Sequence, residues 1–180
     1  MALLRLQLVL AAALVVAAVA LVAPTFAAPG SDHSVRAPTA LEAGVLRELN
    51  AVRTAHGLEP LRLNGELGVA AAQHSREMVA DGYFEHASHD GTAFWKRIGR
   101  WYGSYGYTRW AVGENLLWSS PDVSPAAAVR LWMRSPEHRA NILAARWREI
   151  GVSALHAESA PGTFRGLAVT IVTTDFGARS

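Results

Sequence analysis

The chain has 180 residues, with 17 basic and 15 acidic side chains and a formal net charge of +2. This length favours one domain, and so small a charge, spread along the chain with Lys96 as the only lysine, predicts neither a basic patch nor nucleic-acid binding. The absence of cysteine excludes disulfides, thiol chemistry and cysteine metal sites, so stability must come from the core.

The N-terminal segment predicts export. Residues 6–23 follow Arg5 and consist of Leu, Val and Ala with only Gln7 polar, and the triplet ending at Ala27 fits the small-x-small rule of signal peptidase. We expect residues 1–27 to be a signal peptide. Because the apolar run is about 18 residues long, an uncleaved membrane anchor is the alternative. Either way the domain is secreted or tethered to the outer face, and it meets the membrane only through this segment.

The folded domain is expected to span residues 39–180, after a Pro-, Gly- and Ser-rich flexible spacer at 28–38. Thr39 and Glu42 have the spacing of a capping box. Apolar residues then recur at helical spacing, and Gly57 is expected to stop this first helix.

Two further helices are expected before residue 100. Pro60 keeps the next segment extended, and Asn64 then caps a second helix that ends at Gly82. His74 lies on the apolar stripe of that helix, so we interpret it as a hydrogen-bonded core residue. A short third helix is expected to start at Thr92.

The C-terminal half predicts two helices and a hairpin. The aromatic, glycine-rich stretch 101–118 has no helical period and is expected to be irregular and strand-like. Proline follows an N-cap serine at Ser124 and again at Ser135, and each pair is expected to open a helix. The apolar segments 149–158 and 165–176 then flank a turn, which predicts an antiparallel hairpin and an α+β class.

His138 is the strongest candidate for a functional histidine. It is the third residue of the helix opened by Ser135, and Ile142, four residues later, shares its face, so the ring should point inward. Because the helix N-terminus disfavours imidazolium, a neutral ring is expected. Glu137 should instead face solvent.

Two other segments supply candidates. His86 and His89 lie three residues apart in a polar loop, and Glu114 is closely followed by Leu116 and Leu117. A glutamate in such a setting needs a partner, because an unpaired buried charge is very costly. Two histidines and one carboxylate could converge on zinc. The sequence contains neither an HExxH helix nor a GxSxG elbow.

Six blocks of sequence, in register between about Leu41 and Gly177, resemble the CAP superfamily of cysteine-rich secretory, antigen 5 and pathogenesis-related proteins. They include "YFEHASHDG", "GENLLW", "RSPEHRANIL" and "TTDFG". The sequence is most similar to the cysteine-free bacterial secreted branch. The resemblance implies a three-layer α-β-α sandwich with a central antiparallel sheet. It also implies a cleft lined by a His/Glu tetrad that binds zinc or another divalent ion.

The resemblance places individual residues in that cleft. Its histidines correspond to His86 and His138, and the glutamate of the "GEN" block corresponds to Glu114. These three are also the implied metal ligands. Where eukaryotic relatives carry a second glutamate, this chain has Ser135, and the nearby Glu137 is the alternative fourth member. Three ligands would leave positions open for water.

Two functions remain open. The favoured one is a monomeric, non-enzymatic extracellular binding module with a lipid, sterol or glycan ligand. Six aromatic residues suit such a ligand or simply form core and cleft wall; they are Trp95, Trp101, Tyr102, Tyr105, Tyr107 and Trp110. The alternative is a zinc-assisted hydrolase, a peptidase or cell-wall enzyme, in which Glu114 acts as base on a zinc-bound water.

Overall fold

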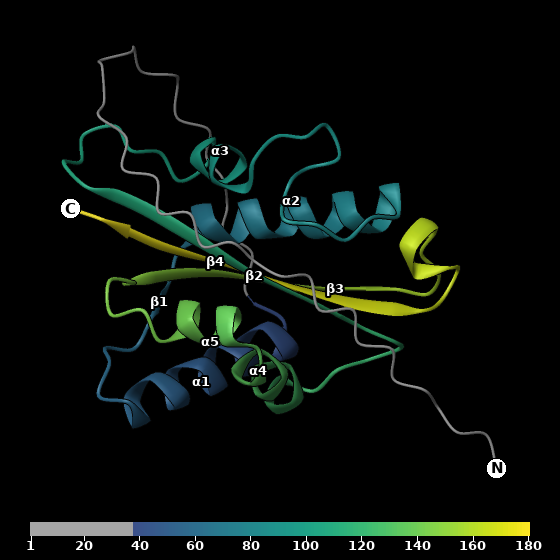
Figure 1. The fold of residues 1–180 in the computed structure, drawn as a ribbon, viewed down its shortest axis with the longest axis horizontal. Helices are drawn as coiled ribbons and strands as arrows, with labels where there is room; N and C mark the ends of the chain where they lie inside the picture. Colours follow the sequence, from purple (N-terminus) through teal and green to yellow (C-terminus); the bar gives the residue numbers. More distant parts are fainter. Residues whose placement is uncertain (1–37) are drawn as a thin grey trace.

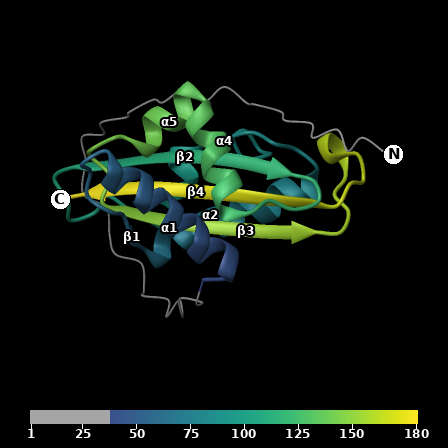
Figure 2. The same cartoon turned by 90° about the horizontal axis from the view of Figure 1, so that it is seen from below.

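The computed structural model describes residues 38–180, so the expected signal peptide and nearly all of the spacer lie outside the described residues. One sheet lies between two layers of helices (Figure 1). Figure 2 shows three helices across the face turned to the viewer, α1 (Ala40–Ala55), α4 (Pro125–Arg134) and α5 (Pro136–Ile142). The opposite face is covered by α2 (Gly65–Asp81) and α3 (Phe94–Gly99). The expected α-β-α sandwich is confirmed.

The sheet has four strands in the order β1-β3-β4-β2. They are β1 (Arg62–Leu63), β2 (Trp110–Ser119), β3 (Glu149–Ala157) and β4 (Val169–Arg179). β4 pairs antiparallel with both β2 and β3, which confirms the predicted hairpin. The two-residue strand β1 runs parallel to β3, an addition to the expected antiparallel sheet. β2 therefore lies at one edge of the sheet.

Capping residues and glycines in the sequence correctly predicted most helix boundaries. The Thr39 and Glu42 capping box forms, the Asn64 side chain caps α2, and Gly82 ends α2 in the left-handed conformation. The start of α3 was predicted wrongly. Its N-cap is Ala93, which makes no side-chain capping bond, whereas the backbone N–H of Thr92 is held by the Asp90 carboxylate in the preceding turn.

The aromatic segment is more regular than expected. Residues 110–119 form a ten-residue strand, every residue of which is in register with a residue of β4 from Arg179 to Thr170. Only the part before Trp110 is irregular. Pairing with a distant strand fixes this element, and the composition of the segment carries no sign of that pairing.

Two apolar layers hold the helices onto the sheet. Trp132, Trp147 and Phe176 are fully buried between the sheet and the α1, α4 and α5 layer. Met78 and Tyr102 are buried on the opposite face, beneath α2 and α3. Within the described range 38–180, no helix is both long and apolar enough to cross a membrane.

A very close contact between a helix and the sheet occurs at Gly151 of β3. A Cβ atom there would lie 2.1 Å from the Leu67 carbonyl carbon and 2.3 Å from the Gly68 nitrogen in α2. Both obstacles are backbone atoms, which cannot rotate away. Glycine at this position therefore sets how closely α2 lies on the sheet.

We expect Gly151→Ala to lower the free energy of unfolding by about 3 kcal/mol or more, because the added methyl group forces α2 away from β3. The matched control is Gly68→Ala, where the added Cβ meets nothing within 4 Å. That variant should be neutral or stabilised by up to about 1 kcal/mol. Urea unfolding of both variants checks the prediction, and similar stabilities would contradict it.

Candidate functional site

The predicted pair His86 and Glu114 is in direct contact. His86 Nδ1–H donates to Glu114 Oε1 at 2.7 Å, and Arg97 of α3 forms an ion pair with Glu114 Oε2. Arg97 also donates to the His86 carbonyl oxygen at 2.9 Å. The side chains of Arg97 and Glu114 are fully buried, and that of His86 is 20% exposed. The partner that Glu114 was predicted to need is therefore mainly Arg97.

The "GEN" block has a physical role at each position. A Cβ on Gly113 would lie 2.7 Å from Asn141 Oδ1 and 2.8 Å from the Trp147 ring, so only glycine lets α5 approach the strand this closely. Glu114 contacts the layer of α2 and α3, and Asn115 contacts the α5 layer. β2, the edge strand, thereby connects the two helical layers on opposite faces of the sheet.

Asp175 is a second buried carboxyl group at this point. It lies opposite Glu114 in the pairing of β2 with β4 and is fully buried. Neither of its oxygens has a hydrogen-bond partner in the described part of the chain, so an ionised Asp175 would be unsatisfied. Burial, reinforced by the Glu114 charge, raises the pKa of Asp175 well above its ordinary value. Burial and the Glu114 charge thus favour the protonated form of Asp175.

Glu114 is the ionised member of the two carboxyl groups. Burial by itself raises the pKa of Glu114, but the Arg97 charge and the His86 hydrogen bond outweigh burial, so the pKa lies well below 4.5. The pKa values of the two neighbouring carboxyl groups are thus shifted in opposite directions. Glu114 holds the charge because it has the cation.

An asparagine network fixes α5 against β2. Asn141 Nδ2–H donates to the Glu114 carbonyl oxygen at 3.2 Å and to Asn115 Oδ1 at 3.0 Å. Asn115 Nδ2–H donates in turn to the His138 carbonyl oxygen at 3.2 Å. Trp147 Nε1–H donates to the Asn141 carbonyl oxygen at 2.9 Å. Every link is buried, so the position of His138 relative to the strand is fixed.

His138 lies near enough to His86 for their charges to interact. It is 6% exposed, which confirms that its ring is turned inward. Burial, and then the neighbouring His86, lower the pKa of His138 to about 4, so the ring is neutral at ordinary pH. The expected neutral state holds, although its cause is burial rather than the helix terminus. His86 Nε2 is itself buried and has no hydrogen-bond partner in residues 38–180.

The remaining candidates form no hydrogen bond with His86, Glu114 or the His138 ring in residues 38–180, although the charge of Glu137 acts on His138 and that of His74 acts on Glu114. Ser135 is buried, but its hydroxyl donates to Glu137 at 3.2 Å rather than to a histidine, and Glu137 is exposed as expected. His74 is a fully buried core residue whose Nε2 lies 2.9 Å from the Glu85 carbonyl oxygen, as predicted. His89 stacks against Tyr83, with ring centroids 5.5 Å apart.

Arg97 and Asp175 were not identified from the sequence. Arg97 lies on a short helix 17 residues before Glu114, and nothing local to it indicates burial. Asp175 carried a signal, since it is a carboxylate within an otherwise uncharged, buried stretch of its strand. The rule that demanded a partner for Glu114 applies to Asp175 equally.

Most of the aromatic residues that the sequence offered as possible ligand contacts pack within the fold instead. Tyr102 is fully buried, and its hydroxyl donates to Glu149 at 2.7 Å. Trp101 and Trp110 are half-buried, and their indole N–H groups donate within the fold. Tyr105 is 70% exposed. The interpretation of these residues as core and wall fits the structure better than the interpretation as ligand contacts.

Of the predicted metal ligands at this site, only the imidazoles of His86 and His138 are available to bind a metal ion. Both Glu114 oxygens are occupied, and Arg97 places a positive charge beside them. Within residues 38–180, no group of three His, Cys, Asp or Glu side chains is arranged to hold a metal ion. Glu114 instead orients His86 from behind, the usual position of a carboxylate that supports a metal-binding histidine.

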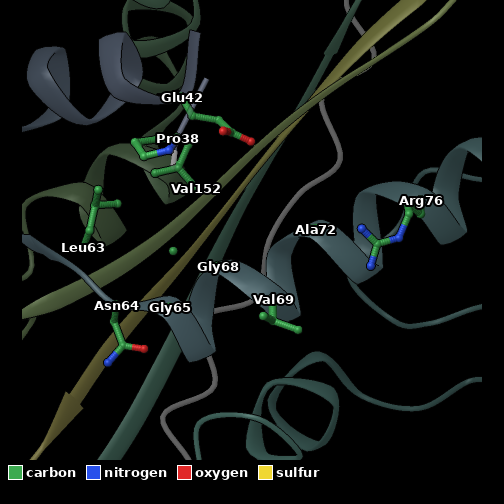
Figure 3. A pocket seen from close by; sticks show the side chains of 11 residues that line it. Pro38, Glu42, Leu63, Asn64, Gly65, Gly68, Val69, Ala72, Arg76 and Val152 are labelled. Atoms are coloured by element: carbon green, nitrogen blue, oxygen red, sulfur yellow. The ribbon is translucent and has the colours of Figure 1, made fainter. Parts of the chain in front are cut away.

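A separate apolar pocket lies between α2, β3 and the start of α1 (Figure 3). Its volume is about 290 Å³. Val69, Ala72 and Val152 form part of its wall, and the polar side chains of Glu42, Asn64 and Arg76 also line it. None of the candidate residues of the cleft lines this pocket.

Removing the buried cation tests the electrostatic account of the site. Arg97→Met should lower the free energy of unfolding by about 3–5 kcal/mol, because it leaves Glu114 charged, buried and without its cation. Adding Glu114→Gln should recover part of the loss, since the uncompensated charge is then gone. Urea unfolding at neutral pH measures all three proteins. A loss under about 1 kcal/mol in Arg97→Met, or no recovery in the double variant, would contradict the account.

The lowered pKa of His138 predicts a dependence of stability on pH. The unfolded chain binds a proton at His138 near pH 6.5, but the folded chain binds it only near pH 4. Stability from this group is therefore complete above pH 6.5 and is lost as the pH falls towards 4. His138→Gln should remove that part of the dependence. Unfolding measured from neutral to acidic pH checks it, and identical profiles for the two proteins would refute it.

Known proteins share this sequence pattern and fold. The model of the Cysteine-rich secretory protein family, CAP, matches residues 46–174. YkwD of Bacillus subtilis (strain 168) is 32% identical over 122 residues, which cover 67% of this chain and 45% of that protein. The chain therefore spans less than half the length of this curated relative.

Solved structures with the same fold include two bacterial surface or extracellular proteins. An outer surface protein of Borrelia burgdorferi has a TM-score of 0.59 at 19% identity, over 76% of this chain and 90% of that one. An extracellular SCP-domain protein of Bacillus anthracis str. Ames has a TM-score of 0.56 at 23% identity, over 84% and 45%. Because the family match covers more than half of the sequence, the chain belongs to the Cysteine-rich secretory protein (CAP) family.

Proposed function

We propose that this chain is an extracellular binding module whose cleft between His86 and His138 holds a hydroxyl-rich ligand, a glycan. The observation that carries the proposal is the buried, unpartnered Nε2 of His86. Buried polar atoms normally have partners. An atom without one is a candidate ligand contact.

Glu114 prepares His86 for this role. Because Nδ1–H donates to Glu114, the neutral ring carries its lone pair on Nε2. His138, whose pKa is lowered to about 4, supplies a second imidazole near it. Two imidazoles in fixed positions offer acceptors to a pair of sugar hydroxyl groups.

An aromatic ring borders the His86 imidazole. Phe94 lies with its ring centroid 6.1 Å from that of His86. Phe94 is half-buried. Rings with an exposed part beside fixed hydrogen-bonding groups are the combination that small-molecule sites use for orientation and contact.

The same network argues against hydrolysis with Glu114 as base. A general base works best with a pKa near the working pH, whereas the pKa of Glu114 is lowered and both its oxygens are engaged. The Ser135 hydroxyl has a carboxylate partner and not an imidazole. Binding therefore accounts for the geometry better than the hydrolase alternative.

A divalent ion is compatible with this proposal. His86 Nε2 and His138 would hold it, and Glu114 would orient His86. Zinc or a similar ion supplies a positive centre that attracts a ligand oxygen. The role of Glu114 as orienting partner is the same with or without the ion.

A lipid or sterol would need another place. The cleft is bordered by buried polar groups, and the apolar pocket of Figure 3, at about 290 Å³, is at the lower limit of common small-molecule sites. A glycan is therefore the ligand class that the cleft favours. The extracellular setting of the Bacillus anthracis relative agrees with such a role.

Calorimetric titration of the domain with soluble peptidoglycan fragments and neutral oligosaccharides tests the proposal. We expect saturable binding by the unchanged protein and at least about tenfold weaker binding by His86→Phe and by His138→Phe, because each removes one acceptor but keeps a ring. The control is His89→Phe, in the same loop but without contact to Glu114, which should bind normally.

A parallel zinc titration separates the metal from the glycan. Binding near one equivalent that is lost in the double variant of His86 and His138 would support a metal-assisted cleft. If no oligosaccharide binds saturably, or if His89→Phe is as weak as His86→Phe, the proposed glycan cleft is wrong.

A further inference from the structure

The fold gathers arginines that are far apart in the sequence. Arg109 precedes β2, Arg146 and Arg148 precede β3, and Arg179 ends β4, and all four line one groove of about 510 Å³. The groove lies where β2 begins and β4 ends, which is the end of the sheet at the C-terminus in Figure 1. The expectation that spread-out arginines form no basic patch was therefore wrong, because strand pairing brings three segments together.

The positive charge in this groove is only partly balanced, by Glu66 at Arg179 and by the C-terminal carboxylate of Ser180, which also lines the groove. No Asp or Glu is among its lining residues. Arg179 has an ion pair with Glu66 at 2.8 Å, whereas Arg109, Arg146 and Arg148 have no carboxylate partner within residues 38–180. Three guanidinium groups without an Asp or Glu partner in the described residues thus line one groove.

A buried cation adds to the field of the groove. Arg53 of α1 is fully buried, and its guanidinium bonds only to carbonyl oxygens, including that of Ile142 at 2.7 Å and that of Glu59 at 3.0 Å. Burial, and then the nearby Arg148, lower the pKa of Arg53. The two charges are close enough to repel, and an anion bound beside Arg148 would relieve that repulsion.

The guanidinium groups are held in position before any ligand arrives. Arg146 lies over the Trp147 ring at 4.3 Å, and Arg148 donates to the carbonyl oxygens of Ala145 at 2.7 Å and Trp147 at 2.9 Å. Arg179 stacks on Tyr102 at 4.1 Å. Side chains that are already ordered lose little conformational entropy when they bind.

We propose that this groove binds the phosphate groups of a soluble anionic polymer. Guanidinium groups match phosphate oxygens with paired hydrogen bonds. One carboxylate presents only two oxygens and a single charge, so it would satisfy one arginine and leave the others unpaired. A polymer with successive phosphate groups can engage several.

This site is separate from the glycan cleft. Trp110 in the groove and Glu114 in the cleft are four residues apart on β2, a distance of about 13 Å along the strand. The groove stands on its own charges and does not depend on the proposed function of the cleft. A long ligand could nevertheless reach both.

The test uses the whole folded domain and long-chain inorganic polyphosphate as the probe. The variant is Arg109→Gln with Arg146→Gln, two exposed arginines that leave the Arg179 ion pair intact. The matched control is Arg47→Gln with Arg130→Gln, two exposed arginines on α1 and α4 that change the net charge equally. Thermal unfolding confirms that both double variants are folded.

We expect saturable polyphosphate binding that weakens at least about tenfold in the groove variant and less than about twofold in the control. An equal loss of polyphosphate affinity in both variants would show that only the net charge matters, and it would overturn the proposal. Equally tight binding of poly-glutamate, or tighter binding of a single-stranded oligonucleotide or of vesicles containing phosphatidylglycerol, would assign the groove to another ligand and overturn it as well.

Discussion

The ion pair between Arg97 and Glu114 is the interaction on which the arrangement of the candidate site depends. Both side chains are fully buried, and neither charge would be tolerated there alone. Arg97 joins α3 and the loop of His86 to the edge strand, because the same guanidinium donates to the His86 carbonyl oxygen. The pair thus fixes the ring and its supporting carboxylate together, and it leaves Nε2 as the free atom.

The second constraint comes from the other face of the sheet. The bonds of Asn141 and Asn115 hold α5 to β2, and the missing side chain of Gly113 permits that contact. His86 therefore comes from the layer of α2 and α3 and His138 from the α5 layer, and both contact β2. A site assembled in this way needs no catalytic motif within any single segment.

Much of the fold could be read from local sequence. Caps such as Thr39 and Asn64 act through bonds to residues three positions away, so their signals lie within one short window. The inward direction of His138 also follows from helix phase alone. The β2 strand was harder, since its regularity comes from pairing with β4 about sixty residues later.

The site was only partly predictable for a related reason. Burial of Glu114 could be inferred from its apolar neighbours, and with it the need for a partner. The identity of that partner depends on how α3 meets the sheet, which no local pattern records. The arginine groove shows the same limit, because Arg109, Arg146 and Arg179 are neighbours only after the strands have paired.

The most direct test of the account is the tautomer of His86, read from the nitrogen-15 chemical shifts of its ring at neutral pH. If Glu114 orients the ring as described, Nδ1 carries the proton and Nε2 has the shift of an unprotonated nitrogen, and Glu114→Gln weakens that preference. A neutral ring with its proton on Nε2 would contradict the account, because the cleft would then present a donor where a ligand is expected to find an acceptor.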